Sequence, residues 1–157
     1  MRIVVLFVVV FLSLGHTASA EDFDTRLVNK LSSMMRVSPP KKIIIEKLTQ
    51  RQMLDGYRSD SLAECMKGDL SRFPYCASVV NVSNTFIHGM WMKHADPTVL
   101  HIRIYKGGGT EAIVHEFLHW ALENNMSFMN GHEVIAPLVS HILAAPEFID
   151  FLQDVEK

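Results

Sequence analysis

Apolar residues recur with the period of a helix near both ends of the sequence. Over residues 22–37 they are spaced three and four positions apart, which predicts a helix with one buried face. Residues 132–143 and 147–155 show a similar pattern, and Pro146 separates these two predicted helices because proline breaks a helix interior. The apolar positions of the first helix are Phe23, Leu27, Leu31, Met34 and Met35.

The segments between these helices are rich in β-branched residues and predict strands. Residues 41–48 and 98–105 are strand-like, as are residues 78–82 and 85–92. In the segment 98–105, apolar and polar positions alternate, so one face of this strand is expected to be buried. A free edge of the strand would let an extended peptide pair with it; the alternative is an ordinary structural strand. The more polar face of the predicted strand carries Val99, His101, Arg103 and Tyr105, and the apolar face carries Leu100, Ile102 and Ile104.

The middle of the chain gives weaker signals. Residues 49–54 favour a turn of helix that Gly56 ends. Residues 59–72 favour a second helix carrying Cys65, and residues 73–76, which include a proline, favour a turn. With 157 residues the chain is long enough for one domain with a real core.

The first twenty residues have the pattern of a secretory signal peptide. Arg2 precedes an apolar run over residues 3–14, and Ala18-Ser19-Ala20 fits a cleavage site. The run is shorter than the roughly 20 residues that a membrane-spanning helix needs, although a membrane anchor is the alternative. We therefore expect a signal peptide at residues 1–20 and a single secreted or periplasmic domain at residues 21–157, without stable membrane insertion after cleavage.

Cysteine content and charge fit an exported protein. Cys65 and Cys76 are the only two cysteines, and in an oxidising compartment such a pair most simply forms one disulfide. A reactive thiol or a metal ligand is the alternative, but neither cysteine lies in a C-x-x-C pattern. The formal net charge is −2, and no run of lysine or arginine marks a nucleic-acid surface.

The strongest chemical signal is the motif His-Glu-x-x-His at residues 115–119, within a predicted helix at residues 110–124. Positions four apart share one helix face, so His115 and His119 can both direct a ring nitrogen at one Zn²⁺ ion. Glu116 can then take a proton from a water molecule on the metal. Thr110 is the expected N-cap of this helix. The alternative is a pair of structural histidines beside a solvated glutamate.

A catalytic zinc site usually has a third protein ligand. His132 and Glu133 are the candidates. His132 follows His119 by thirteen positions, which is enough for the chain to reverse direction and return antiparallel to the metal. Glu133 also has a structural role available, since it would complete a capping box with Asn130. His141 lies further along the same predicted helix and is a weaker candidate, either for the metal or for hydrogen bonding in the transition state.

Taken together, these features resemble the zincin-type metallopeptidases. The motif His115-Glu116-x-x-His119, a short loop, and Asn130-Gly131-His132 opening an apolar helix are most similar to the SprT-like small domains. The resemblance covers residues 99–152 and implies an α+β fold, with a small, mainly antiparallel sheet packed on the active-site helix. It also implies a histidine as third ligand, whereas Glu133 in that role would be closer to the gluzincins. Familiar SprT-like proteins are intracellular and several act near DNA, but this chain has an export signal and no basic patch.

The expected function is therefore that of an exported zinc metallopeptidase. Zn²⁺ would be held by three histidines at positions 115, 119 and 132, with Glu116 as general base and a peptide or protein as substrate. Tyr105 and His141 are further candidates to stabilise the oxyanion. Two alternatives share the scaffold: a non-catalytic zinc-containing binding module, and a zinc amidase acting on a cell-wall bond. Neither a nucleic-acid partner nor a particular oligomeric state is indicated.

Overall fold

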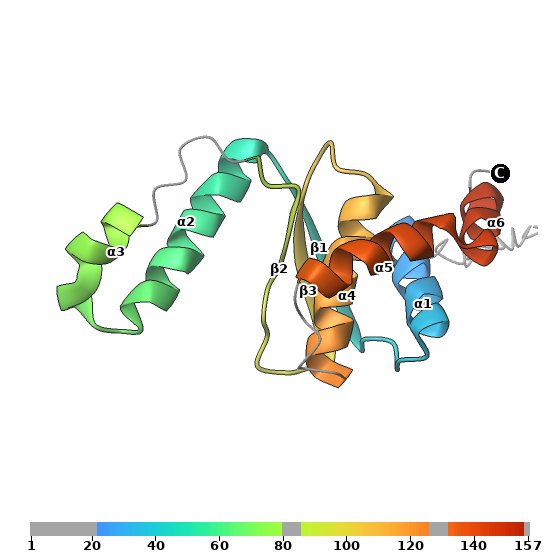
Figure 1. Ribbon diagram of the computed structural model, residues 1–157, viewed down its shortest axis with the longest axis horizontal. Helices are drawn as coiled ribbons and strands as arrows, with labels where there is room; N and C mark the ends of the chain where they lie inside the picture. Colours follow the sequence, from blue (N-terminus) through green and yellow to red (C-terminus); the bar gives the residue numbers. More distant parts are fainter. Residues whose placement is uncertain (1–21, 80–85, 126–131, 156–157) are drawn as a thin grey trace, which may run out of the picture.

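The computed structural model describes residues 22–79, 86–125 and 132–155, without the side chains of residues 78, 79 and 132; the predicted signal peptide lies outside these residues. Within them, helices pack on both faces of a small three-stranded sheet (Figure 1). The elements are, in order, α1 (Phe23–Met35), β1 (Lys42–Leu48), α2 (Gln50–Met66), η1 (Leu70–Arg72), α3 (Phe73–Val79), β2 (Gly89–Trp91), β3 (Val99–Tyr105), α4 (Thr110–Asn125), α5 (His132–Ala144) and α6 (Pro146–Val155).

The sheet has the order β1-β3-β2 and confirms the α+β class. Strands β1 and β3 are parallel, with Lys42 opposite Val99 and Leu48 opposite Tyr105, whereas β2 pairs antiparallel with β3. The sheet is therefore mixed rather than mainly antiparallel. Strand β3 is central, so the expectation of a free edge on it is wrong, and β2 is the edge strand on that side.

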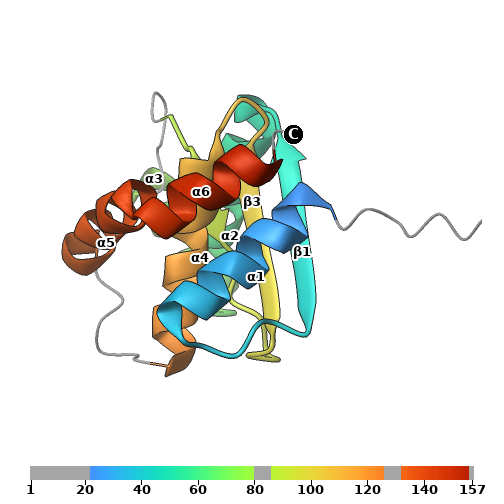
Figure 2. The ribbon, with the colours of Figure 1, turned by 90° about the vertical axis from the view of Figure 1, so that its right-hand side faces the viewer.

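The two faces of β3 meet different surroundings, as the alternation of its residues predicts. Leu100, Ile102 and Ile104 are buried in the core that β3 forms with α1, α4, α5 and α6. Figure 2 shows α1, α4, α5 and α6 on this side of the sheet. On the other side lies α2, and Arg103 of β3 forms an ion pair with Asp60 of α2.

Helix α2 is longer than the sequence pattern suggests. It begins after a capping box, in which the Thr49 hydroxyl accepts from the Gln52 N–H and the Gln52 side chain accepts from the Thr49 N–H. The helix continues through Gly56, where the sequence pattern predicts its end. A Cβ at Gly56 would lie 3.4 Å from Nη1 of Arg103, an ordinary van der Waals distance, where the helix crosses the sheet.

The segments after α2 also differ from the sequence-based expectation. Residues 73–76 begin α3 instead of forming a turn, since Pro74 takes a place in the first turn of a helix, where its missing N–H costs nothing. Ser78 and Val79 are helical, so the predicted strand over residues 78–82 is wrong at these positions, and the rest of it lies outside the described residues. The strand predicted at residues 85–92 is reduced to the three residues of β2.

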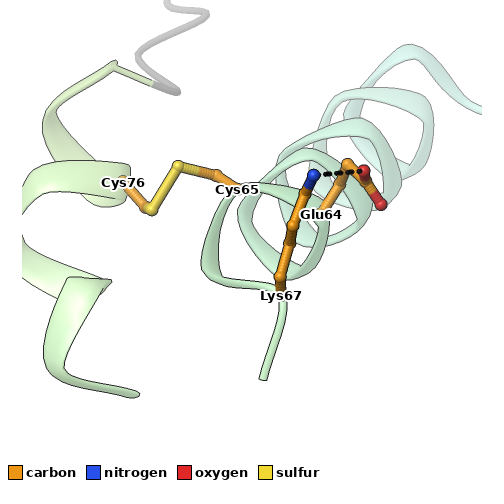
Figure 3. The surroundings of a disulfide bond; sticks show 4 residues. All are labelled: Glu64, Cys65, Lys67 and Cys76. Atoms are coloured by element: carbon orange, nitrogen blue, oxygen red, sulfur yellow. Dashed lines mark ion pairs between the residues drawn. A yellow bond between two sulfur atoms is a disulfide. The ribbon is translucent and has the colours of Figure 1, made fainter. Parts of the chain in front are cut away.

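The two cysteines are paired in the structure, as predicted. Their Cα atoms are 5.8 Å apart, and the disulfide joins α2 to α3 across eleven positions of sequence. Figure 3 shows the bond next to the ion pair between Glu64 and Lys67. The disulfide therefore fixes α2 and α3 relative to each other and does not tie either helix to the sheet.

Among the described residues, no single helix has the length and apolar character needed to cross a membrane. One pair of consecutive helices is long and apolar enough when taken together, by length and composition alone. The pair consists of Glu133–Ala144 and Pro146–Val155, with a bend of 63° between them.

Candidate metal centre

A tight turn leads from β3 into α4. The Gly108 N–H donates to the Tyr105 carbonyl across 2.6 Å, and a Cβ at Gly107 would lie 2.6 Å from the Tyr105 ring. A Cβ at Gly108 would lie 2.8 Å from the Tyr105 carbonyl oxygen, so these close approaches explain two of the three glycines before α4, whereas a Cβ at Gly109 would meet nothing within 4 Å. Thr110 is the first residue of the helix instead of the N-cap that precedes it, so that part of the prediction was displaced by one residue.

Helix α4 holds His115 and His119 side by side, one turn apart on a partly buried face. Their Nε2 atoms are 3.2 Å apart and their ring centroids 5.0 Å apart. Two histidine nitrogens at 2.0–2.1 Å from a tetrahedral zinc ion would be about 3.3 Å from each other. The pair therefore fits one edge of a zinc tetrahedron, although the same spacing also suits one N–H···N hydrogen bond between two neutral rings.

Glu116 lies beside this pair and is only 6% exposed. Burial raises the pKa of its carboxyl group from the ordinary 4.5 to about 7, while a hydrogen bond from the Trp91 main-chain N–H opposes part of that rise in pKa. The carboxylate rests against β2 at Gly89, where an added Cβ would be 2.6 Å from Oε1. A solvated glutamate at this position, the alternative that the sequence left open, does not agree with this burial.

Two clefts meet at Gly89 and Glu116. The larger, of about 710 Å³, lies between α2 and β2 and includes His119 on its α4 side. Its α2 side is lined by Tyr57, Asp60, Ser61 and Glu64. The smaller, of about 430 Å³, includes His115 and is bounded by the segments 86–89 and 108–112. Glu116 is thus accessible from both directions while remaining largely shielded from water.

The third ligand is not settled by the described side chains. His132 begins α5, and its side chain lies outside the described residues. Glu133 is exposed, and among the described side chains no group of three His, Cys, Asp or Glu residues is arranged to hold a metal ion. His141 is exposed on α5, and the Tyr105 ring packs against Phe86; neither residue lines either cleft.

Two residues of β2 lie against the candidate site although they are not among the site residues that the sequence predicts. Gly89 gives Glu116 its space, and Trp91 lies with its indole almost parallel to the His119 ring, at 4° and 6.5 Å between centroids. The Trp91 Nε1 atom is buried, and no hydrogen-bond partner for it lies among the described residues. A single glycine inside a strand pattern does signal a close approach by another group, and this was the available clue to Gly89.

No family model matches this chain, and no curated protein and no solved structure matches it.

Proposed function

We propose that this chain is an exported zinc-dependent metallopeptidase, with His115, His119 and His132 as ligands and Glu116 as general base. The observation that carries the proposal is the 3.2 Å separation of the two Nε2 atoms beside a buried carboxylate at the junction of two clefts. A structural zinc site would normally be closed by four ligands and has no use for a buried acid next to it. This favours an enzyme over a non-catalytic binding module.

Zinc, when bound, supplies a Lewis acid that lowers the pKa of a water molecule and polarises a carbonyl group. Glu116 takes the proton from the attacking water and returns it to the amine that leaves when the peptide bond breaks. Because burial raises the pKa of Glu116 towards neutrality, the carboxylate is suited to both steps near neutral pH.

The surroundings of Glu116 support an extended peptide as substrate. Strand β2 is an edge strand, and its residues line the larger cleft, so a peptide lying there can pair with the main-chain groups of β2 other than the Trp91 N–H, which donates to Glu116. The clefts extend from Glu116 in two directions, which leaves room for residues on both sides of the bond that is cleaved. Hydrolysis of a cell-wall amide would use the same catalytic residues, so only tests with different substrates distinguish an amidase from a peptidase.

The deciding experiment measures zinc content and turnover on the same samples. The mature chain should bind one zinc ion and cleave fluorescein-labelled casein, an unstructured protein. Glu116→Gln should keep the metal and lose about 10²–10⁴-fold in turnover, because the amide cannot accept the proton. His115→Ala should lose metal and turnover together. A glutamine variant as active as the wild type would exclude Glu116 as the base, and zinc-loaded protein that cleaves a peptidoglycan fragment but not casein would favour the amidase.

A further inference from the structure

Strand β2 presents alternate residues to the candidate metal centre. Gly89 and Trp91 lie towards α4, whereas the Met90 side chain extends to the other face, where its Cε is 3.8 Å from the Cβ position of Gly56 in α2. A Cβ on Gly89 would be 2.6 Å from Oε1, 2.8 Å from Cγ and 3.0 Å from Cδ of Glu116. The space that a side chain at this position would occupy is therefore filled by the glutamate.

Conformation does not explain the glycine. Among the described residues, Gly68 is the glycine with positive φ, so Gly89 has a backbone that other residues adopt without strain. Two positions further along β2, the Trp91 main-chain N–H donates to the Glu116 carboxylate. The same short strand thus provides both the space and the hydrogen bond for this group.

We propose that Gly89 is a positioning residue for the general base: the missing side chain lets the Glu116 carboxylate lie against β2, where the Trp91 N–H holds it at the junction of the two clefts. The inference rests on the proposed function, in that Glu116 is taken as the base. Any larger residue at position 89 displaces the carboxylate and breaks its hydrogen bond, while His115 and His119, which are positioned by α4, keep their places.

The contact itself is tested on metal-free protein by a double-mutant cycle that needs no activity. Gly89→Ala should lower the melting temperature by at least about 4 °C in the wild-type background. In the Glu116→Ala background the same change should cost almost nothing, because Cγ, Cδ and Oε1 are gone. Equal losses in both backgrounds would overturn the inference.

Gly56→Ala is the matched control. Its added Cβ would meet its nearest neighbours at 3.4 and 3.8 Å, which are ordinary contacts, and the residue lies inside α2. Replacement of a helical glycine by alanine usually stabilises, so the melting temperature should rise in both backgrounds. A matching rise for Gly89→Ala would also contradict the proposal.

The catalytic consequence is measured on the zinc-loaded variants with labelled casein. Gly89→Ala should reduce kcat by about 100-fold, the usual effect of a displacement near 1 Å, with zinc affinity changed by less than about threefold. Adding Glu116→Asp, which shortens the acid by one methylene, should restore part of kcat to the Gly89→Ala protein. Coupling in the metal-free cycle without any fall in kcat would exclude Glu116 as the base and leave the contact in place.

Discussion

The guanidinium of Arg103 and the carboxylate of Asp60 lie 3.3 Å apart and join the central strand to the helix that lines the larger cleft. Arg103 also donates from Nε to Glu46 of β1 at 2.6 Å. On α2 itself, Met53 is the buried residue among those described. The half-exposed ion pair and the buried Met53 side chain are therefore two of the contacts between this side of the cleft and the rest of the domain.

Asp60→Asn should loosen α2 without unfolding the domain. Asp60 is 50% exposed, so the pair should contribute about 0.2–1 kcal/mol, which is too little to affect the global melting temperature strongly. Amide hydrogen exchange over residues 50–66 should become faster while exchange in β3 stays the same. Asp55→Asn is the control, because Asp55 pairs only weakly with Arg51 and Arg58 of its own helix. Unchanged exchange in Asp60→Asn would mean that the ion pair with Arg103 does not hold the helix.

The identity of the third ligand can be decided by two neighbouring substitutions. If His132 completes the site, His132→Ala should weaken zinc binding by more than about 100-fold, because even loss of a residue that only supports a ligand costs 10–100-fold. Glu133→Gln should cost at most about 1 kcal/mol of stability, since Glu133 is exposed in the first turn of α5. Competition with a chelator measures the first effect and thermal unfolding the second. The opposite result would place the site with the gluzincins.

Stability of the metal-free protein should depend on Glu116 and on pH. Burial raises the folded-state pKa of this group from 4.5 to about 7, so the folded protein binds the proton more tightly than the unfolded chain. The resulting stabilisation is complete below about pH 4.5 and is lost as the pH rises through 7. Converted at 1.36 kcal/mol per pKa unit, the loss is at most about 3 kcal/mol.

Glu116→Gln removes this titration and keeps the shape of the side chain. With a chelator present, denaturant unfolding should show the variant gaining stability relative to the wild type between pH 5 and pH 8. A difference in free energy of unfolding that stays constant over this range would show that Glu116 does not titrate there, and would contradict its burial in an apolar site.

The sequence was sufficient for elements whose determinants are local. The three- and four-residue spacing predicts α1 and α5 almost to the residue, and the four-residue step between His115 and His119 places both rings on one face of α4. The alternation in β3 likewise agrees with its burial pattern. In each case the signal lies within one or two turns of helix or along one strand.

Features that depend on distant segments were missed for a physical reason. Strand β3 is central in the sheet and pairs in parallel with β1. This arrangement follows from the path of the chain through α2, which no local pattern encodes. A glycine at position 56 predicts a helix end locally, but α2 continues through it, and the residues it approaches, Arg103 and Met90, belong to distant strands. The role of Gly89 depends in the same way on Glu116, which belongs to another element.

The two tryptophans differ in their hydrogen bonding, and their replacement should show it. The Trp120 indole N–H donates to the Pro97 carbonyl at 3.1 Å, whereas Nε1 of Trp91 is buried and has no partner within the part of the chain that the structure describes. Trp120→Phe should therefore lose about 1–2 kcal/mol more stability than Trp91→Phe, since only the former breaks a hydrogen bond. Denaturant unfolding of both variants measures the difference. Equal losses of unfolding free energy would mean that both losses come from ring packing and not from the Trp120 hydrogen bond.

The Trp120→Phe protein also provides a direct report on the metal site. The chain has two tryptophans, so Trp91 becomes the only one, and its ring centroid is 6.5 Å from that of His119. Co²⁺ absorbs visible light and has unpaired electrons, so binding at His115 and His119 should quench the emission of the nearby indole. The quenching should saturate at one equivalent of Co²⁺ and disappear when His119→Ala is added. If one Co²⁺ binds and the emission stays unchanged, the ion lies elsewhere, and the two histidines of α4 are a hydrogen-bonded structural pair.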